Sequence, residues 1–132
     1  MANKVNVSFN SKHEGTLKVE NFETKLSYRG EGFAPYELFL GGYASCLHAT
    51  FLGIMKKRKL NFEDVSYEVT SYKREEVPTI INKLVTDVVI TGADEEKHKA
   101  IIKSMEQAEK YCSISYTIHN LEAEMILNIE FK

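Results

Sequence analysis

The chain has 132 residues, 43% of them hydrophobic, which suffices for one domain over residues 1–132 whose core needs no disulfide or metal. Its formal net charge of −2 gives no electrostatic reason to expect a nucleic-acid partner. Two irregularly spaced cysteines, and a polar start in place of an export signal, predict a cytoplasmic protein with reduced thiols.

The amino-terminal segment shows the alternation that is typical of half-buried strands. Hydrophobic and polar residues alternate from Val5 to Phe9 and predict a strand over residues 3–10. A hairpin is predicted from two further strands, residues 16–20 and 24–28. The segment RGEGFAP that follows contains two glycines and a proline, so we expect a loop that leads into the next element.

The segment PYELFLGGYASCLHATFLGIMKKRK, residues 35–59, predicts the helix around which the fold is organised. Glu37 in the first turn and the basic cluster at residues 56–59 both complement the helix dipole. Between Leu38 and Met55 nearly every residue is apolar or small. Such a helix has no fully polar face, so it must be covered on most sides.

Two environments could cover this helix. Its uncharged run reaches only the lower end of the about 20 residues that a transmembrane helix needs. The run also contains Ser45, His48, Thr50 and three glycines, which favours a helix in the core of a soluble protein without a membrane partner. Because one sheet covers only one face of a helix, we expect a homodimer with the central helices at or near its interface.

The second half of the chain predicts three more strands and one more helix. Residues 62–74 and 80–91 alternate and predict a pair of long antiparallel strands. Residues 94–112 predict an amphipathic helix with Asp94 as its N-cap. Residues 122–131 predict the last strand. The order β-β-β-α-β-β-α-β indicates an α+β fold with largely antiparallel pairing. One face of the second helix collects Ile101, Met105, Ala108 and Cys112.

Any reaction chemistry would start from the two cysteines, Cys46 and Cys112. Their separation excludes a CxxC motif, and two thiols alone cannot build a four-ligand zinc site. One interpretation is that both are small apolar core residues. The other is a peroxidatic and resolving pair, in which one thiolate attacks an O–O bond, becomes a sulfenic acid and forms a disulfide with the second thiol. That disulfide requires Cα atoms within about 7 Å of each other.

The histidines are not placed to assist Cys46. His48 follows Cys46 by two positions, so on a helix it points about 200° away, and we expect it in the core or an interface. His13 falls in a turn, while His98 and His119 fall on polar stretches where we expect exposure to solvent. Because no pair has the spacing of metal ligands, we expect no metal site.

Two segments resemble the signatures of the OsmC/Ohr family of osmotically induced and organic hydroperoxide resistance proteins. PYELFLGGYASC precedes an apolar helix, and EKYCSIS ends the second helix. In that family the first motif reads approximately P-x-E-L-x-x-A-x-x-x-C or a near variant, and the second approximately C-P-[IV]-S. The resemblance covers nearly the whole chain in element order. It implies an OsmC-like fold, in which an antiparallel sheet wraps the long central helices of an intertwined homodimer with both active sites at the interface.

The resemblance also implies a function. It is that of a thiol-dependent peroxidase that reduces organic hydroperoxides to alcohols, with Cys46 as the peroxidatic thiolate and Cys112 as the resolving thiol. No bound cofactor is implied, because the family takes its electrons from a small external dithiol of the dihydrolipoyl type.

The chain departs from the family pattern around the thiolate. In the family an arginine from the amino-terminal strands stabilises the thiolate and is held by a glutamate, which Glu37 matches, although some members carry it where Tyr36 stands here. No arginine lies before residue 29, and the family position is closest to Lys12, with Arg29 as an alternative. A lysine can stabilise a thiolate but cannot hold a carboxylate through a bidentate fork.

Two further features bear on the site. At about 100° per residue, Glu37 and Cys46 face opposite sides of a straight helix, so they converge only through a bend, an intervening cation or the dimer. Gly41 and Gly42 would allow a bend, or could serve close helix packing. The second motif reads C-S-I-S and lacks the family's proline.

The missing arginine keeps a second function open. It is an OsmC-fold protein that binds a small molecule or senses oxidants without efficient peroxidase activity. A hydrolase that uses Cys46 ranks third, because no histidine is spaced to serve it.

Overall fold

The computed structural model describes residues 2–121 and 123–132. Two compact units make up the chain, Met1–Gly41 and Gly42–Lys132. Among the described residues each unit contains one three-stranded sheet, and one long helix runs from the first unit into the second. The predicted α+β class is confirmed, while the assignment of residues 1–132 to one domain stays a prediction.

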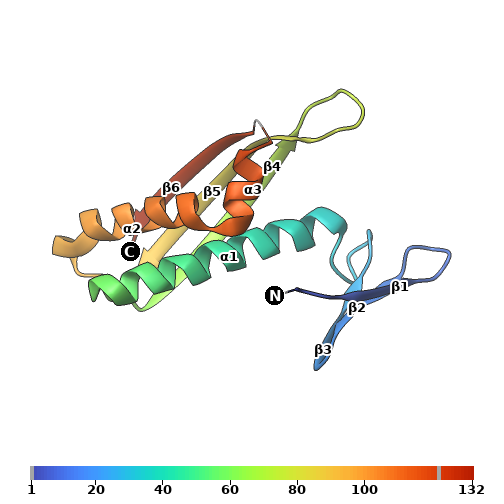
Figure 1. Cartoon of the computed structure of the whole chain (residues 1–132), viewed down its shortest axis with the longest axis horizontal. Helices are drawn as coiled ribbons and strands as arrows, with labels where there is room; N and C mark the ends of the chain where they lie inside the picture. Colours follow the sequence, from blue (N-terminus) through green and yellow to red (C-terminus); the bar gives the residue numbers. More distant parts are fainter. Residues whose placement is uncertain (1, 122) are drawn as a thin grey trace. The chain divides into compact units, whose positions relative to one another are not determined.

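The amino-terminal unit is a meander of three antiparallel strands, β1 (Asn6–Phe9), β2 (Gly15–Val19) and β3 (Phe22–Leu26) (Figure 1). The predicted strand and hairpin are therefore confirmed, with a tighter turn than expected. After β3 the chain loops back, and Phe33 lies beside the end of that strand. Its N–H donates a hydrogen bond to the Lys25 carbonyl at 2.9 Å. Gly32 is needed for this close approach, since a Cβ there would lie 2.6 Å from the Lys25 carbonyl.

Helix α1 (Pro35–Arg58) has nearly the predicted bounds. Its start is capped by the Glu37 side chain, whose Oε1 accepts a hydrogen bond from the Ala34 N–H at 2.8 Å. Residues spaced four apart form its buried stripe, Tyr43, Leu47, Phe51 and Met55. The rest of the helix surface in this single chain is only partly covered.

By length and composition α1 is the one helix among the described residues that could cross a bilayer, a test that core helices of soluble proteins also pass. Its most apolar window has a mean hydropathy of 1.4, and 22% of that window is buried within the chain. This uncovered apolar surface is what the predicted homodimer would bury, and the homodimer stays a prediction.

The second sheet has the order β4-β5-β6, with β4 at Asp64–Lys73, β5 at Ile81–Thr91 and β6 at Glu124–Phe131. Strands β4 and β5 are antiparallel, whereas β5 and β6 are parallel. Largely antiparallel pairing is therefore confirmed, with β6 as the exception, because parallel neighbours need a long crossover and the helices between β5 and β6 supply one. The predicted first residue of the last strand, Glu122, lies outside the described residues.

The crossover contains two helices where the sequence predicts one. A 3₁₀ turn, η1 (Glu95–Lys97), leads into α2 (His98–Tyr111), and Cys112 then adopts an extended conformation with φ −64° and ψ 125°. A helix cannot continue through that ψ, so α2 ends one residue before the predicted boundary. The chain then forms α3 (Ser113–His119), which the sequence did not predict.

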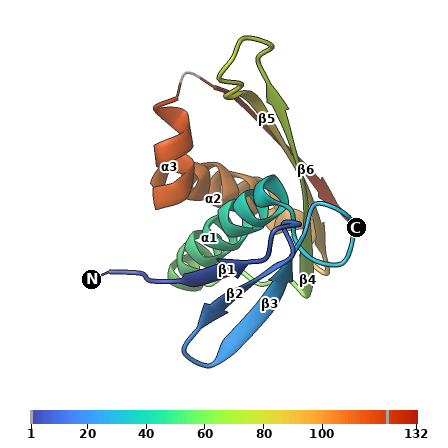
Figure 2. The same cartoon turned by 90° about the vertical axis from the view of Figure 1, so that its right-hand side faces the viewer.

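Both α2 and α3 lie on the same side of the β4-β5-β6 sheet as the carboxy-terminal part of α1 (Figure 2). The predicted apolar face of α2 is confirmed, since Ile101, Met105, Ala108 and Cys112 are all fully buried. The central strand contributes alternate buried residues, including Leu84 and Val88. This layer places the middle of α1 beside the junction of α2 and α3.

Candidate active site

The structure brings the two cysteines together although they lie far apart in the sequence. Cys46 is half-buried in the middle of α1, and Cys112 is fully buried at the junction of α2 and α3. Both are free thiols, and the two sulfurs are close enough that each shifts the pKa of the other, Cys46 downward and Cys112 upward. The Cys46 Sγ also lies 3.8 Å from the Ser113 Oγ. Two thiols in contact at a partly open position can carry out thiol–disulfide chemistry.

The backbone at Cys112 explains why the site forms there. Its N–H completes α2 by donating to the Ala108 carbonyl at 2.8 Å, and its sulfur accepts from the Ser115 N–H at 3.4 Å. Cys112 is thus the last cap of one helix and the first cap of the next. The N–H groups of a helix's first turn have no partner within that helix. Those of Ser113 and Ile114 lower the pKa of Cys46.

These contacts separate the acidities of the two thiols. Burial alone would raise the pKa of Cys46, but hydrogen bonds from the Cys112 thiol, from the Ile114 and Ser113 N–H groups and from the Ser113 hydroxyl lower it below its ordinary value. Burial raises the pKa of Cys112, and its donation to Cys46 raises that pKa further. The pair therefore combines an activated, accessible sulfur with a buried sulfur that keeps its proton.

A buried polar cluster lies behind the two sulfurs. Tyr43, one turn before Cys46 on α1, is fully buried and its hydroxyl lies 3.3 Å from the Thr86 Oγ1 on β5. Burial raises the pKa of Tyr43 to about 12. The hydrogen bond with Thr86 opposes this shift, and Glu109 and Cys112 add to it when they are ionised. This tyrosine stays protonated and acts as a fixed dipole beside the cysteines.

Glu109 is the unusual member of that cluster. Its Oε2 is buried and has no hydrogen-bond partner among the described residues. Burial raises the pKa of Glu109, with a smaller contribution from Glu106 and an opposing one from His119. A buried carboxyl group held closer to its neutral form can store or accept a proton.

His48 takes no part in the thiol pair. Its Nδ1 lies 2.9 Å from the Tyr67 hydroxyl, and its ring packs against Phe51 and Phe62. Burial lowers the pKa of His48, so it is neutral at physiological pH. The prediction of a core histidine is confirmed. In contrast, the predicted exposure of His98 is wrong, because its ring stacks on Phe131 with centroids 3.7 Å apart.

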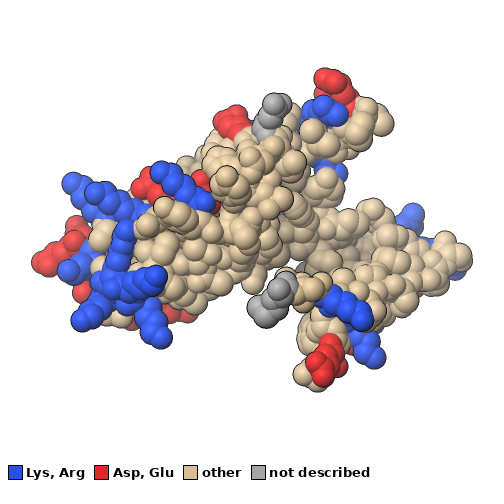
Figure 3. Space-filling model, in the orientation of Figure 1, with Lys and Arg blue, Asp and Glu red and all other residues tan. Residues whose placement is uncertain are grey.

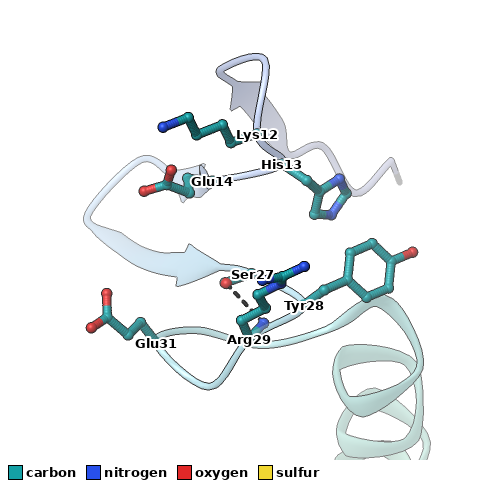
Figure 4. A pocket seen from close by; sticks show the side chains of 7 residues that line it. All are labelled: Lys12, His13, Glu14, Ser27, Tyr28, Arg29 and Glu31. Carbon is teal, nitrogen blue, oxygen red and sulfur yellow. Dashed lines mark hydrogen bonds between the residues drawn. The ribbon is translucent and has the colours of Figure 1, made fainter.

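The three residues predicted to support the thiolate all lie in the amino-terminal unit. Lys12 and Arg29 line a pocket of about 700 Å³, together with His13 and Tyr28. In Figure 4 the His13 ring faces Tyr28, and Lys12 and Arg29 project from two different loops. Glu37 caps the start of α1. Their role toward Cys46, which lies in the other unit, stays a prediction.

The structure also bears on the predictions about a metal site and about Gly41 and Gly42. Among residues 2–121 and 123–132 no group of three or more His, Cys, Asp or Glu side chains is arranged to hold a metal ion. Helix α1 is continuous through Gly41 and Gly42, and apart from the adjacent residues and the nearby backbone of α1 itself no described atom lies within 4 Å of a Cβ placed at either one. Close packing at these glycines is therefore not found inside a single chain.

Sequence reasoning missed the donors that surround Cys46. The backbone N–H groups of Ser113 and Ile114 leave no signal in a side-chain pattern, and α3 itself was not predicted. One signal was available, since Ser113 occupies the position at which the resembled motif has proline.

Comparisons with known proteins show to which family the chain belongs. The sequence model of the OsmC-like protein family matches residues 28–125, which include both cysteines. The protein YhfA of Escherichia coli strain K12 is 29% identical over 83 residues, which are 62% of this chain and 61% of that protein.

Solved structures agree in fold. The OsmC-like protein of Mycoplasma pneumoniae superposes with a TM-score of 0.84 at 18% identity, covering 99% of both chains. A protein from Legionella pneumophila, described as an organic hydroperoxide resistance protein OsmC, gives a TM-score of 0.73 at 17% identity and covers 98% of both chains. Since the family match extends over most of the sequence, this chain belongs to the OsmC-like protein family.

Proposed function

We propose that this protein is a thiol-dependent peroxidase that reduces organic hydroperoxides to alcohols. The observation that carries the proposal is the contact between a half-buried thiol of lowered pKa, Cys46, and a buried thiol of raised pKa, Cys112. A peroxidatic cysteine needs thiolate character and must be accessible to the peroxide. A resolving cysteine must lie close to it as an unreacted thiol.

The reaction follows from that division of roles. The Cys46 thiolate attacks one oxygen of the O–O bond, which breaks to give the Cys46 sulfenic acid and an alkoxide that takes up a proton as the alcohol. The Cys112 sulfur then attacks the sulfenic sulfur, a disulfide forms, and hydroxide leaves with the Cys112 proton as water. An external dithiol reduces the disulfide, restores both thiols and becomes a disulfide itself.

The surroundings favour an organic peroxide. Figure 3 shows Lys and Arg side chains gathered at the end of the carboxy-terminal unit that holds the last turn of α1, with Lys56, Lys57 and Arg58. The visible surface over the middle of α1 and α3 carries few charged side chains (Figure 3). The exposed rings of Tyr111 and Tyr116 flank Cys112 in the sequence, so an apolar tail could pack near the sulfurs.

The further parts of this proposal follow from the resemblance. We expect a homodimer, a dithiol of the dihydrolipoyl type as reductant, and a cytoplasmic location. The Legionella protein of the same fold is described as an organic hydroperoxide resistance protein, which supports the choice of substrate class.

Turnover with a model substrate tests the function. Reduced protein is mixed with cumene hydroperoxide and a dithiol, and peroxide consumption is compared with that of Cys46→Ser, which we expect to lower turnover by at least about 1,000-fold. The matched variant Cys112→Ser should still be oxidised once and accumulate a sulfenic acid that dimedone traps. Undiminished turnover in Cys46→Ser would refute the assigned nucleophile.

A second function is favoured by the absence of the family arginine near residue 12. The same thiol pair could sense oxidants, or the fold could bind a small molecule, without efficient turnover. In that case one equivalent of peroxide would oxidise wild-type Cys46, as a peptide map would show, while added dithiol and excess peroxide would give no sustained consumption.

A further inference from the structure

The second cysteine motif of this chain differs from the pattern it resembles at one residue. Ser113 stands where the resembled motif has proline. Proline has no N–H and no hydroxyl, so it cannot donate a hydrogen bond to a neighbouring sulfur. Serine has both donors. The substitution therefore adds hydrogen-bonding capacity next to Cys112, where the site is built.

The structure directs both donors to Cys46. The Ser113 Oγ lies 3.8 Å from the Cys46 Sγ. The N–H groups of Ser113 and Ile114, at the start of the same helix, also lower the pKa of Cys46. Ser113 is the first residue of α3, so its N–H is not needed by the helix. The contact does not depend on a side chain from the amino-terminal unit.

We propose that Ser113 stabilises the Cys46 thiolate through its backbone N–H and its hydroxyl, and so replaces part of the stabilisation that a neighbouring arginine would give. The inference rests on the proposed role of Cys46 as nucleophile. Charge-assisted hydrogen bonds to a thiolate favour the ionised form without a cation. This explains how a chain without an arginine before residue 29 can still hold an activated sulfur.

The backbone allows a direct test with proline. Cys112 has φ −64° and ψ 125°, which lies in the region that a residue before proline prefers. Ser113 is the first helical residue, a position at which proline is well tolerated. Ser113→Pro therefore removes both donors with little change in backbone conformation, whereas Ser113→Ala removes only the hydroxyl.

The experiment measures how the rate of Cys46 alkylation by iodoacetamide depends on pH in the reduced full chain, with peptide mass spectrometry to count Cys46 alone. Below the midpoint of the profile we expect the rate to fall about threefold in Ser113→Ala and about tenfold in Ser113→Pro. Ser113→Thr keeps both donors and should keep the wild-type profile. The rate at high pH, where every variant is ionised, should change little.

Two results would overturn the inference. One is an unchanged profile in both Ser113→Ala and Ser113→Pro. The other is a larger loss in Lys12→Ala or Arg29→Ala than in Ser113→Pro, which would assign the stabilisation to a cation. Circular dichroism and thermal unfolding check that the proline variant folds. If it does not fold, the alkylation profiles of Ser113→Ala and Ser113→Thr decide whether the Ser113 hydroxyl stabilises the thiolate. Since no peroxide is used, a shifted profile in a protein without turnover would support Ser113 and refute the peroxidase.

Discussion

The two units of the chain differ in how completely they bury their apolar residues. In the carboxy-terminal unit Phe51, Leu84 and Met105 are fully buried. In the amino-terminal sheet only Leu26 is buried, while Phe9 is 48% and Phe22 68% exposed. A three-stranded sheet gains independent stability only when a hydrophobic face is packed.

This difference separates what the thiol pair needs from what the whole protein needs. Every described contact that lowers the pKa of Cys46 comes from the carboxy-terminal unit. The amino-terminal unit brings exposed apolar side chains and the cations Lys12 and Arg29. We therefore expect the first unit to serve assembly and substrate handling, and the second unit to supply the reactive sulfur.

The largest expected effect compares one aromatic residue from each unit. Phe51→Ala removes a fully buried ring, so the free energy of unfolding should fall by about 4 kcal/mol. Phe22→Ala removes an exposed ring and should change it by less than about 0.5 kcal/mol. Urea denaturation of dilute protein measures both. Similar losses in the two variants would mean that the amino-terminal sheet is packed as firmly as the core.

The next effect concerns the uncovered side of α1. Leu52 is 43% exposed on this helix, and the predicted homodimer would bury it. Leu52→Lys should weaken a dimer by at least tenfold, about 1.4 kcal/mol, because a charge would have to be desolvated. Light scattering after size exclusion measures the mass. The control is Asn82→Lys, at an exposed position of β5, and a chain that is monomeric before any substitution would refute the dimer.

A smaller effect depends on pH. Burial raises the pKa of Glu109 in the folded protein, so the folded state binds more protons than the unfolded state above the ordinary carboxyl pKa. Stability therefore falls as pH rises through that interval. Glu109→Gln removes this pH dependence. Above neutral pH its free energy of unfolding should exceed that of the wild type by about 1 kcal/mol, and in acid the two should differ little. Parallel stability–pH curves for both proteins would contradict a raised pKa.

The smallest effect tests the hydrogen bond behind the sulfurs. Tyr43→Phe removes the hydroxyl that lies 3.3 Å from the Thr86 Oγ1 and leaves the ring in place. We expect a loss of about 1 kcal/mol in the free energy of unfolding. Thermal unfolding measures it, and Tyr111→Phe, at a tyrosine that is 71% exposed, is the control. A gain in stability would show that the hydroxyl is poorly satisfied in the wild type.

Residues with a clear period could be placed from the sequence. The central helix, the strands and the apolar face of α2 were predicted because alternation and helical spacing determine which side chains can be buried. Asp94 is the N-cap of the 3₁₀ turn η1 and not of α2, whose N-cap is Lys97, and the Asp94 side chain makes no capping hydrogen bond. The parallel pairing of β6 with β5 could not be predicted from the sequence, because the alternation of residues along a strand does not show the direction of the neighbouring strand.

The sequence allowed the reactive side chains of the candidate site to be predicted, but not the backbone around them. Both cysteines were found from their residue type and their motifs. The extended conformation of Cys112 and the seven-residue α3 were not, because SISYTIH is short and rich in residues with weak helix preference. The groups that tune Cys46 are largely main-chain N–H groups, which every sequence contains, so only their geometry reveals them.

Because Cys112 ends α2 and begins α3, its sulfur is part of the scaffold as well as part of the proposed chemistry. The Ser115 amide donates to that sulfur, and the Tyr116 amide donates to the Cys112 carbonyl. Bond formation at Cys112 would alter the acceptor that orders the first turn of α3. Deuterium uptake at these two amides would then report the redox state directly, and a reducing partner would meet a differently ordered surface in each half of the cycle.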